Sequence, residues 1–146
     1  MSTFTIIVPI FNEKDNLSRL ESELMKFINS TKFKTKVLLI NDGSTDTTQQ
    51  VLSRYKDQLN RPLTLINQRN TGVAKARNNA IDAATGRYVW LLDADDELAE
   101  NSIAAVLTYL TESQPELLLG SHVNVKPDGK RKTIARKSAS DNRLEN

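Results

Sequence analysis

The chain has 146 residues, of which 38% are hydrophobic and 26% charged, as expected for one globular domain with a core of ordinary size. It contains no cysteine, which excludes a disulfide scaffold and thiolate metal sites and fits a cytoplasmic location. No apolar run reaches the roughly 20 residues of a membrane span, and the amino-terminal run lacks the basic residues of a signal peptide.

The formal net charge of +2 is unevenly distributed, because residues 126–137 contain six Lys or Arg and one Asp. A basic stretch can contact nucleic acid or anionic lipid. This one lacks interleaved aromatic side chains, so we interpret it as a solvated hairpin or tail. We therefore expect no nucleic-acid partner, and leave open a peripheral contact with the cytoplasmic face of a membrane.

Apolar periodicity alternates along the chain between that of strands and that of helices. The predicted elements are a strand over 4–10, a helix capped by Asp15 or Asn16, a strand over 35–40, a helix with Asp46 and Gln49 as a capping box, a strand over 62–67, a helix from Thr71 or Gly72 to a C′ glycine at Gly86, a strand over 87–92, a helix over 102–112 and a strand over 116–125. Residues 127–129 (Pro-Asp-Gly) form a turn that begins a hairpin. We expect one domain over 1–136, followed by a polar tail or truncation point over 137–146.

Strands that alternate with helices predict an α/β fold with a mainly parallel sheet covered by helices on both faces. Such sheets bind ligands outside the carboxyl ends of their strands. The residues just past the first four strands are Phe11, Asn12 and Glu13; Asn41, Asp42, Gly43 and Ser44; Gln68, Arg69 and Asn70; and Asp93, Asp95 and Asp96. All four loop ends are polar and three carry carboxylates, so a ligand site is expected there.

Asp93 and Asp95 are two residues apart at the end of an extended strand, so their side chains are expected to point the same way. Two converging carboxylates suit Mg²⁺ or Mn²⁺, which also take phosphate oxygens from a substrate. The alternative is a solvated acidic turn, and an Asp-x-Asp pattern alone is weak. An EF-hand loop is excluded, because Leu98 and Ala104 stand where Gly and Glu are required.

Asp42 lies in the turn-forming run NDGSTD, and we expect it to accept hydrogen bonds from a base or a sugar. Arg77 has two alternatives, a diphosphate contact or an ion pair with an Asp of the acidic loop, whereas Lys75 is interpreted as solvated. Glycine-rich phosphate loops of the P-loop or Rossmann type are absent from the sequence. A bound diphosphate would therefore need a divalent cation.

Four segments, TIIVPIFNE, LLINDGSTDTT, NTGVAKARNNAIDAATGRYVWLLDADD and LLLGSHVNVKPDGK, together resemble the inverting nucleotide-diphospho-sugar transferases of glycosyltransferase family 2, with the GT-A fold. The resemblance covers nearly all of residues 3–130, in the family's order and spacing. It implies transfer of a sugar from a nucleotide-diphospho-sugar, commonly a UDP-sugar, to a hydroxyl of a saccharide or lipid-linked acceptor.

The resemblance also implies a role for each site residue. It assigns Pro9, Phe11, Asn12 and Glu13 to the base and ribose pocket, Asp42 to the base, Asn70, Gly72 and Arg77 to the donor site with Arg69 as a further contact, Asp93 to the ribose or the metal, and Asp95 to the metal that bridges the diphosphate. The metal, Mn²⁺ or Mg²⁺, would stabilise the departing nucleoside diphosphate.

In the family, a carboxylate of the acceptor-binding half deprotonates the acceptor. Neither Asp128 in its turn nor Asp141 in the polar tail suits that role, so we expect the base to lie outside these residues and the chain to be the donor-binding part. A non-catalytic nucleotide-binding or assembly module is the alternative. A nucleotidyltransferase is a remote reading, because FNEKDN lacks the glycine and arginine expected after the first strand.

Overall fold

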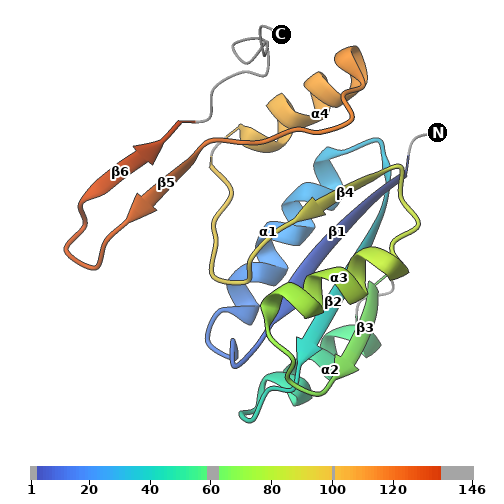
Figure 1. The fold of residues 1–146 in the computed structure, drawn as a ribbon, viewed down its shortest axis with the longest axis vertical. Coiled ribbons are helices and arrows are strands. Elements are labelled where there is room, and N and C mark those ends of the chain that lie inside the picture. Colours follow the sequence, from blue (N-terminus) through green and yellow to red (C-terminus); the bar gives the residue numbers. More distant parts are fainter. Residues whose placement is uncertain (1–2, 59–62, 100, 136–146) are drawn as a thin grey trace, which may run out of the picture. The chain divides into compact units, whose positions relative to one another are not determined.

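The computed structural model describes residues 3–58, 63–99 and 101–135, and the chain divides into two compact units, residues 1–108 and 109–146. The elements in chain order are β1 (Thr3–Ile10), α1 (Leu17–Ser30), β2 (Lys34–Asp42), α2 (Thr48–Gln58), β3 (Leu63–Gln68), α3 (Val73–Ala83), β4 (Tyr88–Leu91), α4 (Ser102–Ser113), β5 (His122–Val125) and β6 (Arg131–Ile134). Figure 1 shows these elements along the chain.

Strands β1 to β4 form one parallel sheet in the order β3-β2-β1-β4. The longest pairing joins β1 to β2, from Thr3 opposite Lys34 to Ile10 opposite Asn41. All residues of β1 from Phe4 to Ile10 are buried. A continuous apolar strand in the middle of a parallel sheet is covered on both faces, which is why the sequence of β1 shows no alternation.

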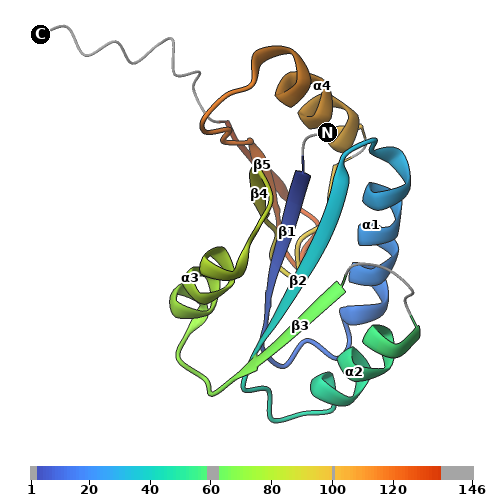
Figure 2. The ribbon, with the colours of Figure 1, turned by 90° about the vertical axis from the view of Figure 1, so that its right-hand side faces the viewer.

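Helices α1 and α2 cover one face of this sheet and α3 covers the other, as Figure 2 shows. The buried side of α1 recurs at helical spacing and consists of Leu17, Leu20, Leu24 and Phe27. On the opposite face, Ala76 and Ala80 of α3 pack against Ile7, Leu38 and Ile40 of the sheet. The prediction of a mainly parallel sheet covered on both faces is confirmed.

The predicted strand over 116–125 is wrong in extent and in place. Only His122–Val125 is extended, and it pairs antiparallel with Arg131–Ile134 in a separate two-stranded sheet. The Pro127-Asp128-Gly129 turn closes this hairpin, with Gly129 in the left-handed region (φ 80°) and its N–H donating to the Lys126 carbonyl at 2.8 Å. A pairing closed by so short a loop loses little chain entropy, so the local hairpin forms without a partner from the parallel sheet.

Helix α3 ends at Ala83, so the prediction that Gly86 is its C′ residue is wrong. Gly86 instead lies against β1, where its N–H donates to Thr5 Oγ1 at 3.0 Å. A Cβ at this position would lie 2.6 Å from the same hydroxyl oxygen and 2.8 Å from the Thr5 nitrogen. Gly86 is thus required for close approach of two backbones.

In place of the predicted capping box between Asp46 and Gln49, α2 begins with a hydrogen bond between residues two positions apart. The helix begins at Thr48, and the Asp46 carboxylate accepts from the Thr48 N–H at 2.9 Å, two residues later. A hydrogen bond from the Thr48 side chain is the main cause that lowers the pKa of Asp46, and this backbone bond adds to it. At α1 the N-cap is Asn16, one of the two predicted alternatives.

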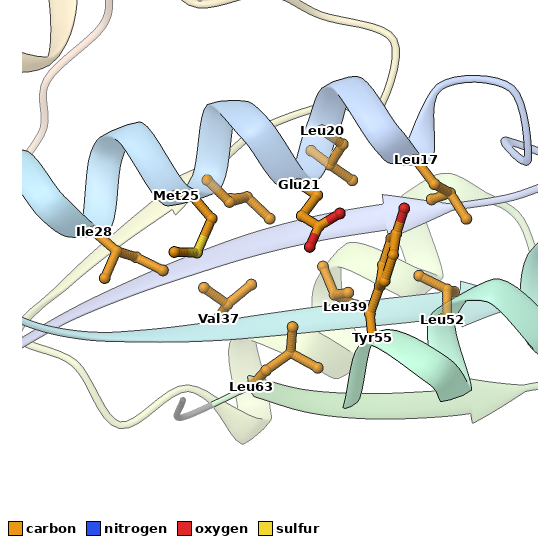
Figure 3. A pocket seen from close by; sticks show the side chains of 11 residues that line it. Leu17, Leu20, Glu21, Met25, Ile28, Val37, Leu39, Leu52, Tyr55 and Leu63 are labelled. Atoms are coloured by element: carbon orange, nitrogen blue, oxygen red, sulfur yellow. The ribbon is translucent and has the colours of Figure 1, made fainter. Parts of the chain in front are cut away.

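A cavity lies between α1 and α2 over β2 and β3, and Figure 3 shows the side chains around it. Its lining consists of Leu17, Leu20, Glu21, Leu24, Met25, Ile28, Val37, Leu39, Leu52, Tyr55 and Leu63. Burial, followed by the charge and hydrogen bonding of Glu21, raises the pKa of Tyr55. An apolar lining of this kind does not suit a nucleotide or a diphosphate.

Candidate functional site

The loops after β1 and β2 are joined through the side chain of Asn12. Its Oδ1 accepts from the Thr45 N–H at 2.8 Å, and its own N–H donates to Ser44 Oγ at 3.0 Å. Asn12 adopts a positive φ of 57°, which asparagine tolerates better than most residues. The Glu13 N–H donates to Thr48 Oγ1 at 3.0 Å, which adds a second link between the same two segments.

Asn41 and Asp42 end β2, and both are buried, at 1% and 4% exposure. The Asn41 amide donates to Asn67 Oδ1 at 3.1 Å and accepts from the Ser44 N–H at 3.1 Å. These bonds account for both polar ends of the Asn41 side chain. Its role in the described structure is therefore to fix the turn that follows β2.

The Asp42 carboxylate joins the loop after β2 to the loop after β3. Its Oδ1 accepts from Gln68 Nε2 at 2.7 Å and from the Thr71 N–H at 2.9 Å, and its Oδ2 accepts from the Gly72 N–H at 2.9 Å. Burial by itself would raise the pKa of Asp42, but the hydrogen bonds from Gln68, Thr71 and Gly72 together lower it below 3.8. Asp42 is thus held ionised, and Oδ2 keeps capacity to accept a further bond.

Gln68 is a site residue whose role in this network the sequence reasoning missed. Besides its bond to Asp42, its Nε2 donates to Thr71 Oγ1 at 2.8 Å, and its Oε1 accepts from Asn79 Nδ2 at 2.7 Å. In the sequence, Gln68 is only one of several polar residues just past a predicted strand. A glutamine at a strand end carries no local signal that it will bridge a carboxylate and a helix.

Arg77 of α3 forms an ion pair with Asp93, through Nη2 and Oδ1, at the end of β4. Of the two alternatives for Arg77, the described structure shows the pair with the acidic loop. The two side chains are 32% and 42% exposed. The Arg77 Nε is buried and has no hydrogen-bond partner among the described residues, so one donor is left over beside the acidic loop.

The acidic loop after β4 is a tight turn. The Leu92 N–H still pairs with β1, donating to the Ile7 carbonyl at 3.0 Å, and the Asp96 N–H then donates to the Asp93 carbonyl at 3.1 Å. Asp95 is exposed at the turn. No group of three or more His, Cys, Asp or Glu that could hold a metal ion occurs among the described residues.

Arg19 of α1 is the second residue that the sequence reasoning missed. It donates from Nη1 to the Asp96 carbonyl at 2.5 Å and from Nη2 to the Ala94 carbonyl at 3.1 Å. Arg19 and the acidic loop are 75 and 77 residues apart along the chain. No periodicity or motif links residues at such a separation.

The remaining predicted site residues lie at the same edge of the sheet. Pro9 is buried in β1 just past Ile7, where pairing with β4 ends, so its missing N–H removes no ladder bond. Phe11 is 44% exposed, an unusual position for a large apolar ring. Asn70 and Arg69 are exposed in the loop after β3, and a Cβ on Gly43 would lie 2.6 Å from the Asn70 nitrogen.

Solved structures with this arrangement are glycosyltransferases of the GT-A type. The chain matches Staphylococcus aureus TarS (residues 1–349) in complex with UDP-GlcNAc with a TM-score of 0.61 and 27% identity, covering 83% of this chain and 33% of TarS. It matches the mannosyltransferase PcManGT from Pyrobaculum calidifontis, in complex with GDP-Man and Mn²⁺, with a TM-score of 0.62 and 29% identity, covering 76% and 33%. Both of these structures are complexes of a transferase with a nucleotide-sugar.

The family model described as glycosyl transferase family 2 matches residues 5–145, and the chain belongs to this family. Glycosyltransferase GlyG of Streptococcus pneumoniae is 28% identical over 120 residues, which cover 82% of this chain and 39% of GlyG. The poly(ribitol-phosphate) β-N-acetylglucosaminyltransferase TarS of Staphylococcus aureus is 29% identical over 119 residues, 82% of this chain and 21% of TarS. The chain thus spans less than half the length of these relatives.

Helices long and apolar enough to cross a lipid bilayer are not found in the part of the chain that the structure describes.

Proposed function

We propose that the chain binds the nucleotide-diphospho-sugar donor of a glycosyltransferase that transfers the sugar, with inversion, to an acceptor hydroxyl. The observation that carries this proposal is the linkage of all four loop ends at one edge of the sheet. Asn12 joins the first to the second, Asp42 the second to the third, and Arg77 connects α3 to the fourth. A binding edge whose loops hold one another is preorganised for a ligand.

The base and ribose would bind at the first two loop ends. Phe11 offers an exposed aromatic ring for stacking on a base, a contact that any nucleobase can make. Asp42 is ionised and can accept a further N–H or O–H, consistent with recognition of uracil. Asn12 and Glu13 act in the described structure by holding the adjoining loops, and Pro9 is buried in β1 two residues before Phe11.

The diphosphate would lie near the loop after β3 and the acidic turn. Asn70 and Gly72 lie just before the start of α3, next to Arg69 in the chain. The Arg77 side chain is 32% exposed, which supports a contact between its guanidinium and the donor in addition to the ion pair with Asp93.

The residues present fit a divalent metal that the substrate helps to hold. The side chain of Asp95 is exposed, so its carboxylate is accessible to a metal ion. The carboxylate of Asp93 already forms an ion pair with Arg77. Mg²⁺ and Mn²⁺ are commonly held by one or two carboxylates plus substrate phosphates, so no third protein carboxylate is required. When bound, such an ion neutralises charge that builds on the departing nucleoside diphosphate.

The chain's own residues would bind and orient the donor. Further parts of the parent enzyme would bind the acceptor and supply the carboxylate that deprotonates it. A saccharide or a lipid-linked hydroxyl is the proposed acceptor. This division is supported by the relatives, of which the chain covers 39% or less in GlyG and TarS. We expect the 146-residue chain to bind the donor and to show little or no transfer by itself.

The test is calorimetric titration of UDP, and of GDP for comparison, into the chain with and without Mn²⁺. We expect Mn²⁺ to tighten binding of one of them, and Asp95→Ala to abolish that effect while metal-free binding persists. Lys75→Ala is the matched control, because Lys75 is exposed on α3. Absence of any metal-enhanced binding, in a folded sample, would contradict the proposal.

The alternative is a non-catalytic nucleotide-binding or assembly module derived from the same fold. It is favoured because the described residues contain no group of three or more His, Cys, Asp or Glu that could hold a metal ion without the phosphates of a substrate. It predicts that either nucleotide binds equally well with and without Mn²⁺. The same titration therefore separates the two functions.

A further inference from the structure

Two backbone carbonyls of the acidic turn point to one guanidinium group, that of Arg19. The accepting carbonyls belong to Ala94 and Asp96, the two residues on either side of Asp95. The Arg19 side chain is 28% exposed; its bond to the Ala94 carbonyl is partly buried, and its bond to the Asp96 carbonyl is exposed. The planar fork of an arginine can donate to two acceptors at once, which a lysine ammonium does less well.

Arg19 and Arg77 hold the same turn from opposite faces of the sheet. Arg19 lies on α1, and Arg77 lies on α3, on the other side of the parallel sheet (Figure 2). Arg77 holds the carboxylate of Asp93, whereas Arg19 holds the main chain around Asp95. Among the described residues, neither arginine bonds to the Asp95 carboxylate.

The guanidinium also offsets repulsion within the turn. Residues 93–97 contain four carboxylates, and like charges at this spacing destabilise one another. The Arg19 Nε lies 3.9 Å from the Glu97 carboxylate, but Glu97 is 75% exposed, so this pair contributes little by itself. The two bonds to carbonyls carry the positional effect, because they fix the chain on both sides of Asp95.

We infer that Arg19 is a positioning residue, which holds the turn so that Asp95 faces a metal-bound diphosphate. This inference rests on the proposed function. Arg19 contacts the acidic turn and none of the residues proposed to bind the nucleobase. Its removal should therefore weaken metal-dependent nucleotide binding and leave metal-free nucleotide binding unchanged. Loss of a residue that orients a metal ligand typically lowers metal affinity about 10- to 100-fold.

The experiment compares Arg19→Met with the unaltered 146-residue chain. Methionine keeps an apolar stem and removes both donated hydrogen bonds. Electron paramagnetic resonance measures Mn²⁺ affinity in the presence of saturating UDP or GDP, whichever binds, and calorimetry measures metal-free nucleotide affinity. We expect Mn²⁺ affinity to fall about 10-fold or more, with metal-free affinity within about twofold of the unaltered chain.

Three further variants identify which contact of Arg19 matters. Arg19→Lys should recover part of the Mn²⁺ affinity, and also serves if Arg19→Met fails to fold. Glu97→Gln removes only the exposed ion pair and should leave Mn²⁺ affinity unchanged. Lys26→Met is the matched control on the same helix, since Lys26 is exposed and pairs with Glu23.

The outcomes separate this inference from the proposed function. If the unaltered chain shows no metal-enhanced binding, both fail. If Asp95→Ala loses the metal effect while Arg19→Met keeps it, only the role of Arg19 is overturned. If Arg19→Met loses metal-free and metal-dependent affinity in equal proportion, Arg19 stabilises the fold and does not position Asp95.

Discussion

The Arg77 guanidinium and the Asp93 carboxylate form an ion pair that connects α3 to the end of β4. The pair joins the two segments proposed to contact the diphosphate, and the buried Arg77 Nε beside it has no hydrogen-bond partner in the described part of the chain. The position of the arginine that we propose to contact a phosphate is therefore set by an acidic residue of the same proposed site.

We expect the pair itself to contribute little to stability, because both side chains are about one third exposed or more. A double-mutant cycle with Arg77→Met and Asp93→Asn should give a coupling free energy of about 1 kcal/mol or less. Urea unfolding at low and at 0.5 M salt measures it, and added salt should reduce it. A coupling of several kcal/mol that ignores salt would show instead a pair shielded from water.

Asp42→Asn should destabilise the chain by about 1–3 kcal/mol at pH 7, since an amide cannot accept all the hydrogen bonds that the carboxylate accepts. The folded-state pKa of Asp42 is lowered, so its contribution is present above the unfolded-state value of 3.8 and is lost as the pH falls through the folded-state pKa. The difference in unfolding free energy between the unaltered chain and the variant should thus be largest at neutral pH and narrow at pH 3.

Urea unfolding followed by circular dichroism at both pH values measures this difference. Asp82→Asn on the exposed side of α3 is the control, and should show little effect at either pH. A difference for Asp42→Asn that stays the same at pH 7 and pH 3 would mean that its ionised form is not what the loops hold.

Gly43→Ala should destabilise the chain by about 1–3 kcal/mol and weaken nucleotide binding. Gly43 has a φ of 72°, and an added Cβ would lie 2.6 Å from the Asn70 backbone nitrogen, which cannot move without displacing the loop after β3. Gly129→Ala is the matched control, because Gly129 shares the positive φ (80°) and has no atom within 4 Å of the added Cβ. Melting temperature and nucleotide affinity are the measurements, and equal losses of stability in the two variants would contradict the close approach.

Tyr55→Phe should change stability at alkaline pH. Burial and Glu21 raise the pKa of Tyr55 above 10.0, so the neutral phenol stabilises the fold below pH 10 and this contribution is lost as the pH rises through the folded-state value. The unaltered chain should therefore lose more stability between pH 9 and pH 11 than Tyr55→Phe does. Unfolding free energies of both proteins at these two pH values test this prediction. Equal losses of stability in the two proteins would mean that the phenol is in contact with water in the folded state.

The sequence by itself determined the elements from β1 to α4 and their order. Apolar periodicity predicted α1 to α4 and β1 to β4, because the 3.6-residue repeat and the short apolar runs are local properties of the chain. The polar residues past each strand then followed from the rule that parallel strands end at one edge. The extended segment at 116–125 shows the limit: an apolar run predicts a strand, but only a pairing partner decides whether and where it forms.

The tertiary structure decided which of those residues act together. Asp42 bonds to Thr71 and Gly72, and Arg19 bonds to carbonyls at 94 and 96, across separations of 29 to 77 residues. Gly86 likewise owes its place to Thr5, 81 residues earlier in the chain, and to no helix end. Hydrogen bonds and close backbone contacts depend on distances in space, and only the folded chain brings these residues together.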